Sequence, residues 1–407
     1  MDVSLLFSPL AQATRRIVIE EPPISPETMW WIGAALFGLW MFSVGASVGS
    51  FLNVVVYRVP AKLNLVSPGS RCPRCLSPIR LRHNIPILGW LMLRGRCADC
   101  HLPIAARYPF VETWLALVFL VVGCVELLGN GMNLPLPSVG SSRPPLTLQD
   151  TRSLAVATLM HLSLLTTLVG AALIDYDGHR IPRRLFVPIL LYAIIAALLW
   201  PAIHPIAAVD SRLWLPPRDP NWRWLAGLVD VSIGALAGLI TSGLIYAATP
   251  FRPLLVQRYA GPVMLMWVMV GVTFGWQFIP LALAGWSITL LFNGQRSDGT
   301  TRWLPPAGSL FAVLLAALLS WRWWHPYLRT TPPAAATSMM LMGMLVLFSG
   351  IVLAMAARLI PADYRGPEPP RLPPPEPELT PAEQTPAELT APSGDETPLP
   401  SEPPESP

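Results

Sequence analysis

Four cysteines in two pairs have the spacing of a metal site. The pairs are Cys72-Pro-Arg-Cys75 and Cys97-Ala-Asp-Cys100, separated by 21 residues, which is close to the spacing of zinc ribbons. A two-residue gap lets a tight turn aim both sulfurs at one ion, and Zn²⁺ takes four thiolates tetrahedrally. Four sulfurs leave no open coordination position, so the pattern predicts a structural zinc site. A pair of disulfides is the alternative, which a reducing cytoplasm disfavours.

A carboxylate ends one of the apolar segments, in Ala172-Leu-Ile-Asp175. An ionisable group at the boundary of a membrane span is a candidate functional residue. The other interpretation is a helix-end residue that faces water beside the arginines at 180, 183 and 184. The local residues favour neither. Cys124 stands alone in an apolar segment and is interpreted as a small buried side chain.

The elements that must position these residues are membrane-spanning helices. The 407 residues are 53% hydrophobic and 13% charged, which excludes an ordinary water-soluble globule. A span needs ~20 mostly apolar residues, and lipid offers no partner for free backbone groups. We therefore predict an all-α polytopic membrane protein with eight or nine spans, because the sixth and seventh are separated only weakly at Gly275-Trp276-Gln277. The apolar segments are 30–57, 109–128, 153–174, 185–202, 224–248, 262–278, 279–294, 305–323 and 337–358.

The arginines indicate the orientation. Segment 58–108, which we call the four-cysteine loop, carries nine basic residues against the single acid Asp99, so it is predicted to be cytoplasmic. Threading the spans from it places the N-terminus outside and the C-terminal tail in the cytoplasm. Arg15-Arg16 is followed by a full span and not by a cleavage site, so no cleaved signal is expected.

The C-terminal tail is predicted to be disordered. After Ile360 it holds 16 prolines, ten acidic residues and two arginines. Such a composition cannot bury enough apolar surface to fold. We expect a solvated, extended chain.

The motifs around the cysteines resemble those of bacterial type IV prepilin peptidases. The resemblance is nearly free of gaps from about 45 to 115, and it continues more loosely to about 325. It rests on Gly45-Ala-Ser-Val-Gly49-Ser-Phe-Leu-Asn53-Val-Val-Val-Tyr57-Arg58-Val-Pro60, the paired knuckles, Asn84-Ile-Pro86-Ile-Leu-Gly-Trp90-Leu-Met-Leu-Arg94-Gly95-Arg96-Cys97, Ala106-Arg107-Tyr108-Pro109-Phe-Val-Glu112, Asp175-Tyr-Asp177-Gly-His-Arg-Ile181-Pro182 and Leu304-Pro305-Pro-Ala-Gly308-Ser-Leu-Phe311.

The resemblance implies a function. The family consists of membrane aspartyl proteases of the Gly-x-Gly-Asp type, which cut the leader from prepilins and pseudopilins at the cytoplasmic face of the membrane. Many members then methylate the new N-terminus with S-adenosylmethionine. For this chain the resemblance implies the bacterial cytoplasmic (inner) membrane, prepilin or pseudopilin substrates, lipid contact and no nucleic acid. Asp175 corresponds to the first catalytic aspartate.

The expected organisation follows from the spans and the resemblance. It comprises an N-terminal non-cytoplasmic segment 1–29, a first transmembrane helix 30–57, the zinc-binding four-cysteine loop 58–108, a transmembrane peptidase-like domain with an extra C-terminal helix 109–358, and the Pro/Glu-rich tail 359–407.

The second catalytic aspartate of the family is missing. The slot of the family's Gly-x-Gly-Asp-x-Lys motif holds Ala260-Gly-Pro-Val263-Met-Leu265. Valine stands at the position of the aspartate and leucine at that of the lysine, and neither side chain can exchange a proton. Asp298, on a predicted inner loop, is the candidate substitute acid, although a solvated turn also explains it.

Two hypotheses remain at this point. One is a prepilin-peptidase-like enzyme with residual or altered activity, in which Asp175 works with a second acid such as Asp298. The other is a catalytically inactive homologue that acts as a binding or assembly component of a pilus or type II secretion system. A third hypothesis, in which only methylation survives, has no Gly-rich nucleotide motif in its favour.

Overall fold

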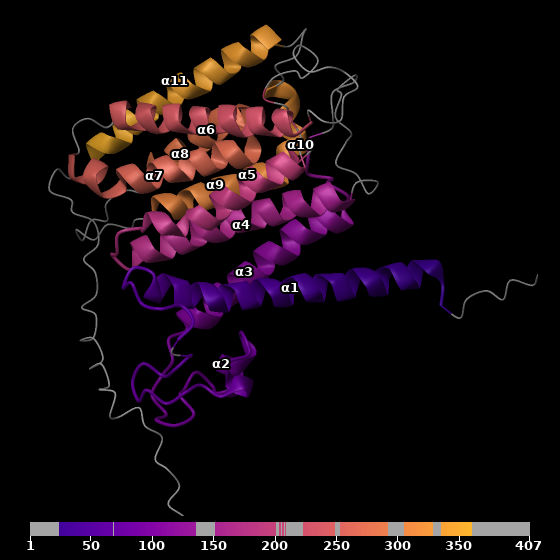
Figure 1. Cartoon of the computed structure of the whole chain (residues 1–407), viewed down its shortest axis with the longest axis vertical. Helices are drawn as coiled ribbons and strands as arrows, with labels where there is room; N and C mark the ends of the chain where they lie inside the picture. The colour runs from indigo at the N-terminus through magenta and orange to yellow at the C-terminus, as the bar shows by residue number, and fades with distance from the viewer. Residues whose placement is uncertain are drawn as a thin grey trace, which may run out of the picture. The chain divides into compact units, whose positions relative to one another are not determined.

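Helices make up most of the described chain (Figure 1). The computed structural model describes residues 24–67, 69–135, 151–200, 223–248, 253–291, 305–328 and 335–359, with positions 203, 204, 206 and 208. The α-helices are α1 (Pro26–Arg58), α2 (Leu88–Met92), α3 (Arg107–Gly123), α4 (Thr151–Tyr176), α5 (Val187–Leu199), α6 (Arg223–Ala248), α7 (Pro253–Phe274), α8 (Ile279–Leu291), α9 (Pro306–Leu319), α10 (Trp321–Trp324) and α11 (Ala335–Leu359). A π-helical turn, Cys124–Leu128, extends α3.

The ends of α1 show why the helix begins and stops where it does. The side chain of Ser25 accepts a hydrogen bond from the amide of Thr28 at 3.2 Å, and Pro26 occupies the first helical position. Both features favour a helix start. At the other end, the guanidinium of Arg58 donates to the carbonyl of Asn64 at 2.9 Å. It thereby holds the first turn of the four-cysteine loop against the helix end.

Among the described residues, five helices are long and apolar enough to cross a membrane, or up to seven if each of two bent pairs forms one span. This count rests on length and composition alone and is lower than the eight or nine spans predicted, although each predicted apolar segment contains a helix. The helices α5, α8 and α9 are only 13 or 14 residues long, whereas ~20 residues are needed for a ~30 Å hydrocarbon layer. The chain is an all-α, multi-pass membrane protein.

The weak break predicted at 275–277 is a sharp bend. Helix α7 ends at Phe274, Gly275 takes a φ of 85°, and a short 3₁₀ turn, Trp276–Phe278, leads into α8. The bend between the two helices is 116°. A φ in this range is favourable for glycine and costly for other residues, so Gly275 allows the chain to turn here.

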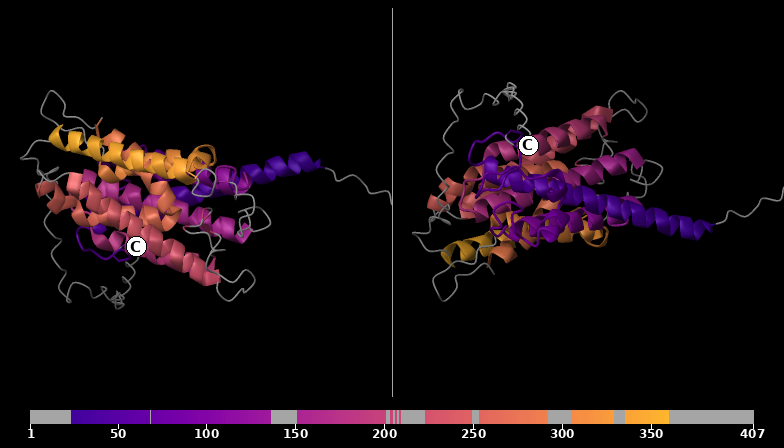
Figure 2. Two further views of the ribbon diagram at one scale, coloured as in Figure 1. Left: turned by 90° about the horizontal axis from the view of Figure 1, so that it is seen from above. Right: turned by 90° about the horizontal axis from the view of Figure 1, so that it is seen from below.

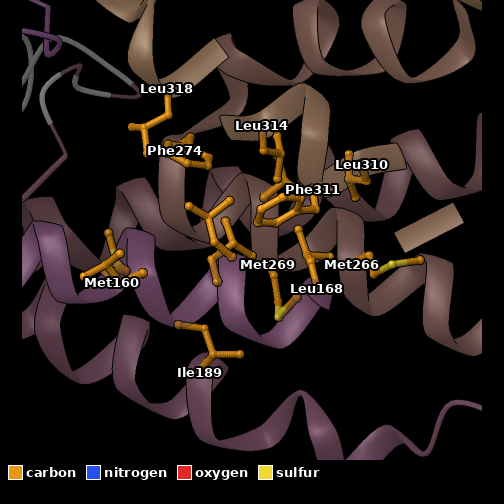
Figure 3. Packing of buried hydrophobic residues seen from close by; sticks show 14 of the residues in the cluster. Met160, Leu168, Ile189, Met266, Met269, Phe274, Leu310, Phe311, Leu314 and Leu318 are labelled. Atoms are coloured by element: carbon orange, nitrogen blue, oxygen red, sulfur yellow. The ribbon is translucent and has the colours of Figure 1, made fainter. Parts of the chain in front are cut away.

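The helices lie side by side, with α1 and α11 on opposite sides (Figure 1). Helix α1 packs mainly on α3, α6 on α7, α11 on α8 and α4 on α9. The N-terminal part of α1 runs past the ends of the other helices (Figure 2). The core lies around α4, and its cluster includes Leu168 of α4, Ile189 of α5, Met266 and Met269 of α7, and Phe311 of α9 (Figure 3).

Two glycines allow α1 to approach α3 closely. A Cβ at Gly45 would lie 2.7 Å from the carbonyl oxygen of Leu115, and a Cβ at Gly49 would lie 2.7 Å from the Cα of Glu112. Such distances are too short for carbon atoms against backbone, so a side chain at either position must push the helices apart. Small residues at four-residue spacing commonly serve this purpose in membrane helix pairs. Gly45 and Gly49 therefore bring α1 against the backbone of α3.

We expect Gly45→Ala together with Gly49→Ala to destabilise the protein by about 1–3 kcal/mol per site, because the added methyl groups overpack the α1–α3 contact. The measurement is the thermal unfolding midpoint of the full chain in lipid nanodiscs. Gly33→Ala is the matched control, because nothing lies within 4 Å of a Cβ there. That variant should be neutral or slightly stabilising. Equal midpoints for all three proteins would contradict the packing argument.

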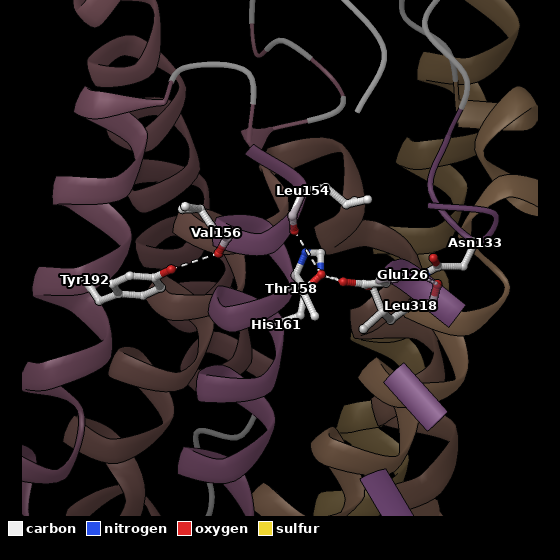
Figure 4. A network of polar contacts seen from close by, with 8 residues as sticks. All are labelled: Glu126, Asn133, Leu154, Val156, Thr158, His161, Tyr192 and Leu318. Atoms are coloured by element: carbon white, nitrogen blue, oxygen red, sulfur yellow. Dashed lines mark hydrogen bonds and ion pairs between the residues drawn. The ribbon is translucent and has the colours of Figure 1, made fainter. Parts of the chain in front are cut away.

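A buried polar network joins three segments inside the bundle (Figure 4). Nδ1 of His161 on α4 lies 2.9 Å from Glu126 Oε1, and the amide of Asn133 donates both to Glu126 at 3.2 Å and to the carbonyl of Leu318 at 3.1 Å. The His161 ring also stacks on Phe274, with centroids 5.1 Å apart. Polar groups enclosed this way must pair with one another, so the network fixes how the π turn, α4 and α9 meet.

Several sequence predictions concern residues outside the described part of the chain. They are most of the N-terminal segment 1–29, the loop that contains Asp298, and the tail beyond 359.

Candidate functional site

The two Cys-x-x-Cys knuckles have the same backbone form. In each, the amide of the first cysteine donates to the carbonyl five residues on, from Cys72 to Ser77 at 3.0 Å and from Cys97 to Leu102 at 2.9 Å. In each, the amide four residues after the first cysteine donates back to that cysteine's carbonyl, at 2.9 and 3.1 Å. The residue after the second cysteine has a φ of 58° in one knuckle and 57° in the other. Both loops therefore aim their sulfurs in the same way.

The four sulfurs converge into one cluster, which we call the four-cysteine cluster. They all lie within 4.8 Å of one another, with Cys72 and Cys100 at 3.8 Å and Cys75 and Cys97 at 3.9 Å. Tetrahedral thiolates with metal–sulfur bonds of ~2.3 Å lie about 3.8 Å apart. Disulfide sulfurs are separated by ~2.05 Å, and all four cysteines are free. The cluster therefore fits a four-coordinate metal ion better than a pair of disulfides.

Polar neighbours prepare one of the thiols. The hydroxyl of Ser77 lies 2.9 Å from Sγ of Cys75 and 2.8 Å from Oδ2 of Asp99, which also pairs with Arg80 at 3.3 Å. Hydrogen bonding by the hydroxyl and amide of Ser77 lowers the pKa of Cys75 from 9.0 to about 6. The thiolate is the form that binds metal, so this sulfur is prepared for coordination near neutral pH.

Glu112 anchors the four-cysteine loop to the membrane helices. The side chain is only 8% exposed, and its Oε2 accepts a hydrogen bond from the amide of Ile87 at 2.6 Å. Ile87 has a φ of 63° and directly precedes α2. Since the backbone of Glu112 also contacts Gly49 of α1, one residue connects the loop, α3 and α1.

A two-point ion pair connects the end of the loop to α4. The guanidinium of Arg107 donates to the carboxylate of Asp177, with nitrogen–oxygen distances of 2.5 and 2.8 Å. Arg107 begins α3, and Asp177 follows the last residue of α4. Paired hydrogen bonds of this kind fix geometry as well as adding energy. The loop and the end of α4 are thus held together.

The carboxylate of Asp175 is enclosed and contacted by a second helix. Asp175 lies in the last turn of α4 and is 3% exposed, so the interpretation of a helix-end residue facing water is wrong. The hydroxyl of Tyr259 on α7 donates to the carboxylate, 2.9 Å from one oxygen and 3.1 Å from the other. Asp177, two residues on, points away to Arg107.

The slot of the missing aspartate lies one helical turn from this contact. Val263 follows Tyr259 by four residues on α7 and is 4% exposed, so it lies on the same face of the helix. The guanidinium of Arg183, in the segment after α4, covers Gly261, whose Cβ would lie 3.1 Å from Nε. The segment that carries the slot is therefore packed against the end of α4 that carries Asp175.

Asp230, a buried acid on α6, contacts residues that precede α6. Asp230 accepts a hydrogen bond from the amide of Ala208 at 2.7 Å, and its other oxygen lies 4.0 Å from His204. Asp298 lies outside the described residues.

Tyr259 is the residue that sequence reasoning missed. It precedes the motif slot directly, in Tyr259-Ala-Gly-Pro-Val263, and is four residues from the valine. A search for hydroxyl or acidic side chains one helical turn from Val263, where the family's aspartate is missing, would have found Tyr259. Nothing in the sequence, however, indicates that it contacts a residue 84 positions earlier.

Comparisons with known proteins agree with this architecture. A family model described as "Bacterial Peptidase A24 N-terminal domain" matches residues 43–125. A prepilin leader peptidase/N-methyltransferase of Myxococcus xanthus is 38% identical over 40% of this chain and 41% of its own length. A protein with the same description from Pectobacterium carotovorum subsp. carotovorum is 27% identical over 70% of this chain and 94% of its own. A type 4 prepilin-like proteins leader peptide-processing enzyme of Escherichia coli O78:H11 is 33% identical over 46% and 66%. No solved structure matches the chain.

The fold and the site define a class of protein: a multi-pass helical membrane protein with a four-cysteine insertion between its first two long spans and a buried carboxylate at the end of the third. These comparisons support the type IV prepilin peptidase family for this chain. It spans about two fifths of the Myxococcus relative and nearly all of the Pectobacterium one.

Proposed function

We propose that this chain is a prepilin-peptidase-like endopeptidase of the bacterial cytoplasmic membrane, which cleaves the leader peptides of type IV prepilins or pseudopilins. The observation that carries this proposal is the enclosed carboxylate of Asp175, which receives a hydrogen bond from Tyr259. In this proposal the four-cysteine loop and the Asp175 end of the bundle face the cytoplasm, as the nine basic residues of 58–108 favour. The tail lies on the same side.

The proposed chemistry assigns different tasks to the two side chains. Aspartic hydrolysis needs an ionised carboxylate to take a proton from water and a protonated partner to support the carbonyl oxygen. Asp175 takes the first task. The Tyr259 hydroxyl takes the second, because a phenol (ordinary pKa ~10) keeps its proton beside a carboxylate (ordinary pKa ~4). A phenol is a weaker acid than a carboxylic acid, so this pair is expected to be slower than two aspartates.

The metal that we assign to the four-cysteine cluster is zinc, in a structural role. The sulfur separations support this assignment, and four thiolates form a closed tetrahedral shell for Zn²⁺. Cys72, Cys75, Cys97 and Cys100 would hold the ion. Its contribution is to keep the two knuckles together.

We expect Asp175→Asn to abolish leader cleavage and Tyr259→Phe to reduce it by roughly 10²-fold, the usual effect of removing one donor to a developing oxyanion. The measurement is cleavage of a prepilin-type substrate from the same genome by the full chain in nanodiscs. Tyr176→Phe is the control, since it removes a hydroxyl from the residue after Asp175, and that residue is 68% exposed. Equal activity in the Asp175 variant would contradict the assignment.

The second candidate function is leader binding without cleavage, as a component of a pilus or type II secretion assembly. The observation that favours it is Val263, a buried residue that cannot ionise at the position of the family's second aspartate. The same preparation decides between the two. An unmodified chain that binds the leader but leaves it intact, alongside a complete family member that cuts, supports the second. Transfer of a labelled methyl group from S-adenosylmethionine, measured in parallel, tests for N-methylation.

A further inference from the structure

The short helix α2, inside the four-cysteine loop, presents three exposed apolar side chains on one face. Leu88, Leu91 and Met92 are 54%, 55% and 57% exposed, and their spacing places them together on a helix. We call these three residues the α2 face. The opposite side is fixed: Gly89 packs against the carbonyl of His83, and the indole of Trp90 donates to the carbonyl of Ile104 at 3.1 Å. The helix therefore cannot turn its apolar face inward.

The α2 face lies beside two membrane spans. The residue before α2, Ile87, is hydrogen-bonded to Glu112, which lies in the second turn of α3 and contacts Gly49 of α1. In Figure 1 the loop lies along the flank of α1 and does not extend away from the end of the bundle. Both spans carry exposed aromatic side chains near this level, Phe51 at 55% and Phe110 at 68%. Exposed apolar side chains thus occur both on α2 and on the two spans next to its anchor.

The charges around the α2 face complement a membrane surface. Arg82, Arg94 and Arg96 are exposed and flank the helix in sequence. The only acid of the loop, Asp99, is already engaged by Ser77 and Arg80. Anionic lipid headgroups attract such clusters, and an amphipathic segment with basic flanks characteristically lies in the interface plane.

We propose that the α2 face inserts into the adjacent lipid leaflet, at the boundary between headgroups and acyl chains, with Arg82, Arg94 and Arg96 at anionic phosphates. The loop is then held by lipid in addition to its covalent connections to α1 and α3. Because Arg107 ties the loop's end to Asp177, this contact also restricts how far the loop can move from the Asp175 end of the bundle.

Depth measurements on the full chain test this insertion. A nitroxide is attached through an unnatural amino acid at position 91, which leaves the four thiols untouched, and the chain is placed in nanodiscs with anionic phosphatidylglycerol. The control label is at Leu102, on the second knuckle and 46% exposed. We expect the ratio of oxygen to nickel-chelate accessibility to be several-fold higher at 91 than at 102. Bound metal, measured on both proteins, verifies that the loop is folded.

The lipid composition separates the apolar from the electrostatic contribution. Replacing phosphatidylglycerol by phosphatidylcholine should bring the label at 91 closer to the water. In a variant with Arg82→Gln and Arg94→Gln, the label should lie at the same depth in the two lipids. Equal ratios at 91 and 102 in both lipids would overturn the insertion and leave the face free for a protein partner. Insertion at the same depth in both lipids would overturn the role given to the arginines.

Discussion

Replacing Val263 by aspartate is expected to raise the rate of leader cleavage by roughly 10²-fold or more, the usual contribution of a positioned general acid or base. Val263 lies one turn after Tyr259, whose hydroxyl contacts Asp175, so the new carboxylate would lie on the helix face directed at the first. Two carboxylates held close together cannot both be ionised, so the pair shares one proton. This supplies the base and the acid that the hydrolysis needs.

The measurement for this gain is the initial rate of leader cleavage by the full chain in nanodiscs. Val263→Asn is the matched control, because asparagine has nearly the same size and polarity as aspartate but cannot ionise. The double variant Val263→Asp with Asp175→Asn should again be inactive. A properly folded Val263→Asp protein that cuts no faster than the unmodified chain would contradict the placement of the slot beside Asp175.

The parts of the site that sequence predicts are the local ones. The four-cysteine cluster was predictable because each pair of sulfurs is positioned by one tight turn, and the Cys-x-x-Cys spacing indicates that turn. The bend after Phe274 was predictable for the same reason, because the positive φ that allows it belongs to one glycine, Gly275. In both cases the signal and the structure that it determines lie within a few residues.

The contacts that define the Asp175 site were not predictable from one sequence. Tyr259 reaches Asp175 across 84 residues, and Arg107 reaches Asp177 across 70. Such contacts depend on how the helices pack, which hydropathy does not encode. Helix ends are also poorly predictable, because an apolar run shows that a segment is buried or in lipid, but not where its helix ends.

The four-cysteine cluster and the carboxylate of Asp175 are connected through a series of contacts. Glu112 fastens the segment before α2 to α3, and Arg107 fastens the start of α3 to Asp177, two residues from Asp175. A change in the loop is therefore transmitted to the end of α4 through named contacts. Through this connection, a metal held by the four-cysteine cluster would influence a site that it does not touch.

Cys97→Ser is expected to remove the metal almost completely, from about one ion per chain to near zero, and to unfold the four-cysteine loop. A structural zinc site contributes roughly 10–16 kcal/mol of apparent binding free energy at neutral pH, and the loop's secondary structure is limited to α2, one 3₁₀ turn and two isolated β-bridges within its described residues. Metal content by mass spectrometry and the rate of tryptic cleavage at the loop's arginines measure the two effects.

Cys124→Ser provides the control, because Cys124 lies in the π turn after α3 and outside the cluster. It should retain the metal and the protease resistance. The helices should survive in Cys97→Ser, because the packing of α1 on α3 through Gly45 and Gly49 does not involve the loop. Cleavage of the leader should nevertheless fall, since the loop no longer positions Arg107 at Asp177. If the full chain purifies with four free thiols and no metal yet resists trypsin, the four-cysteine cluster is not what holds the loop together.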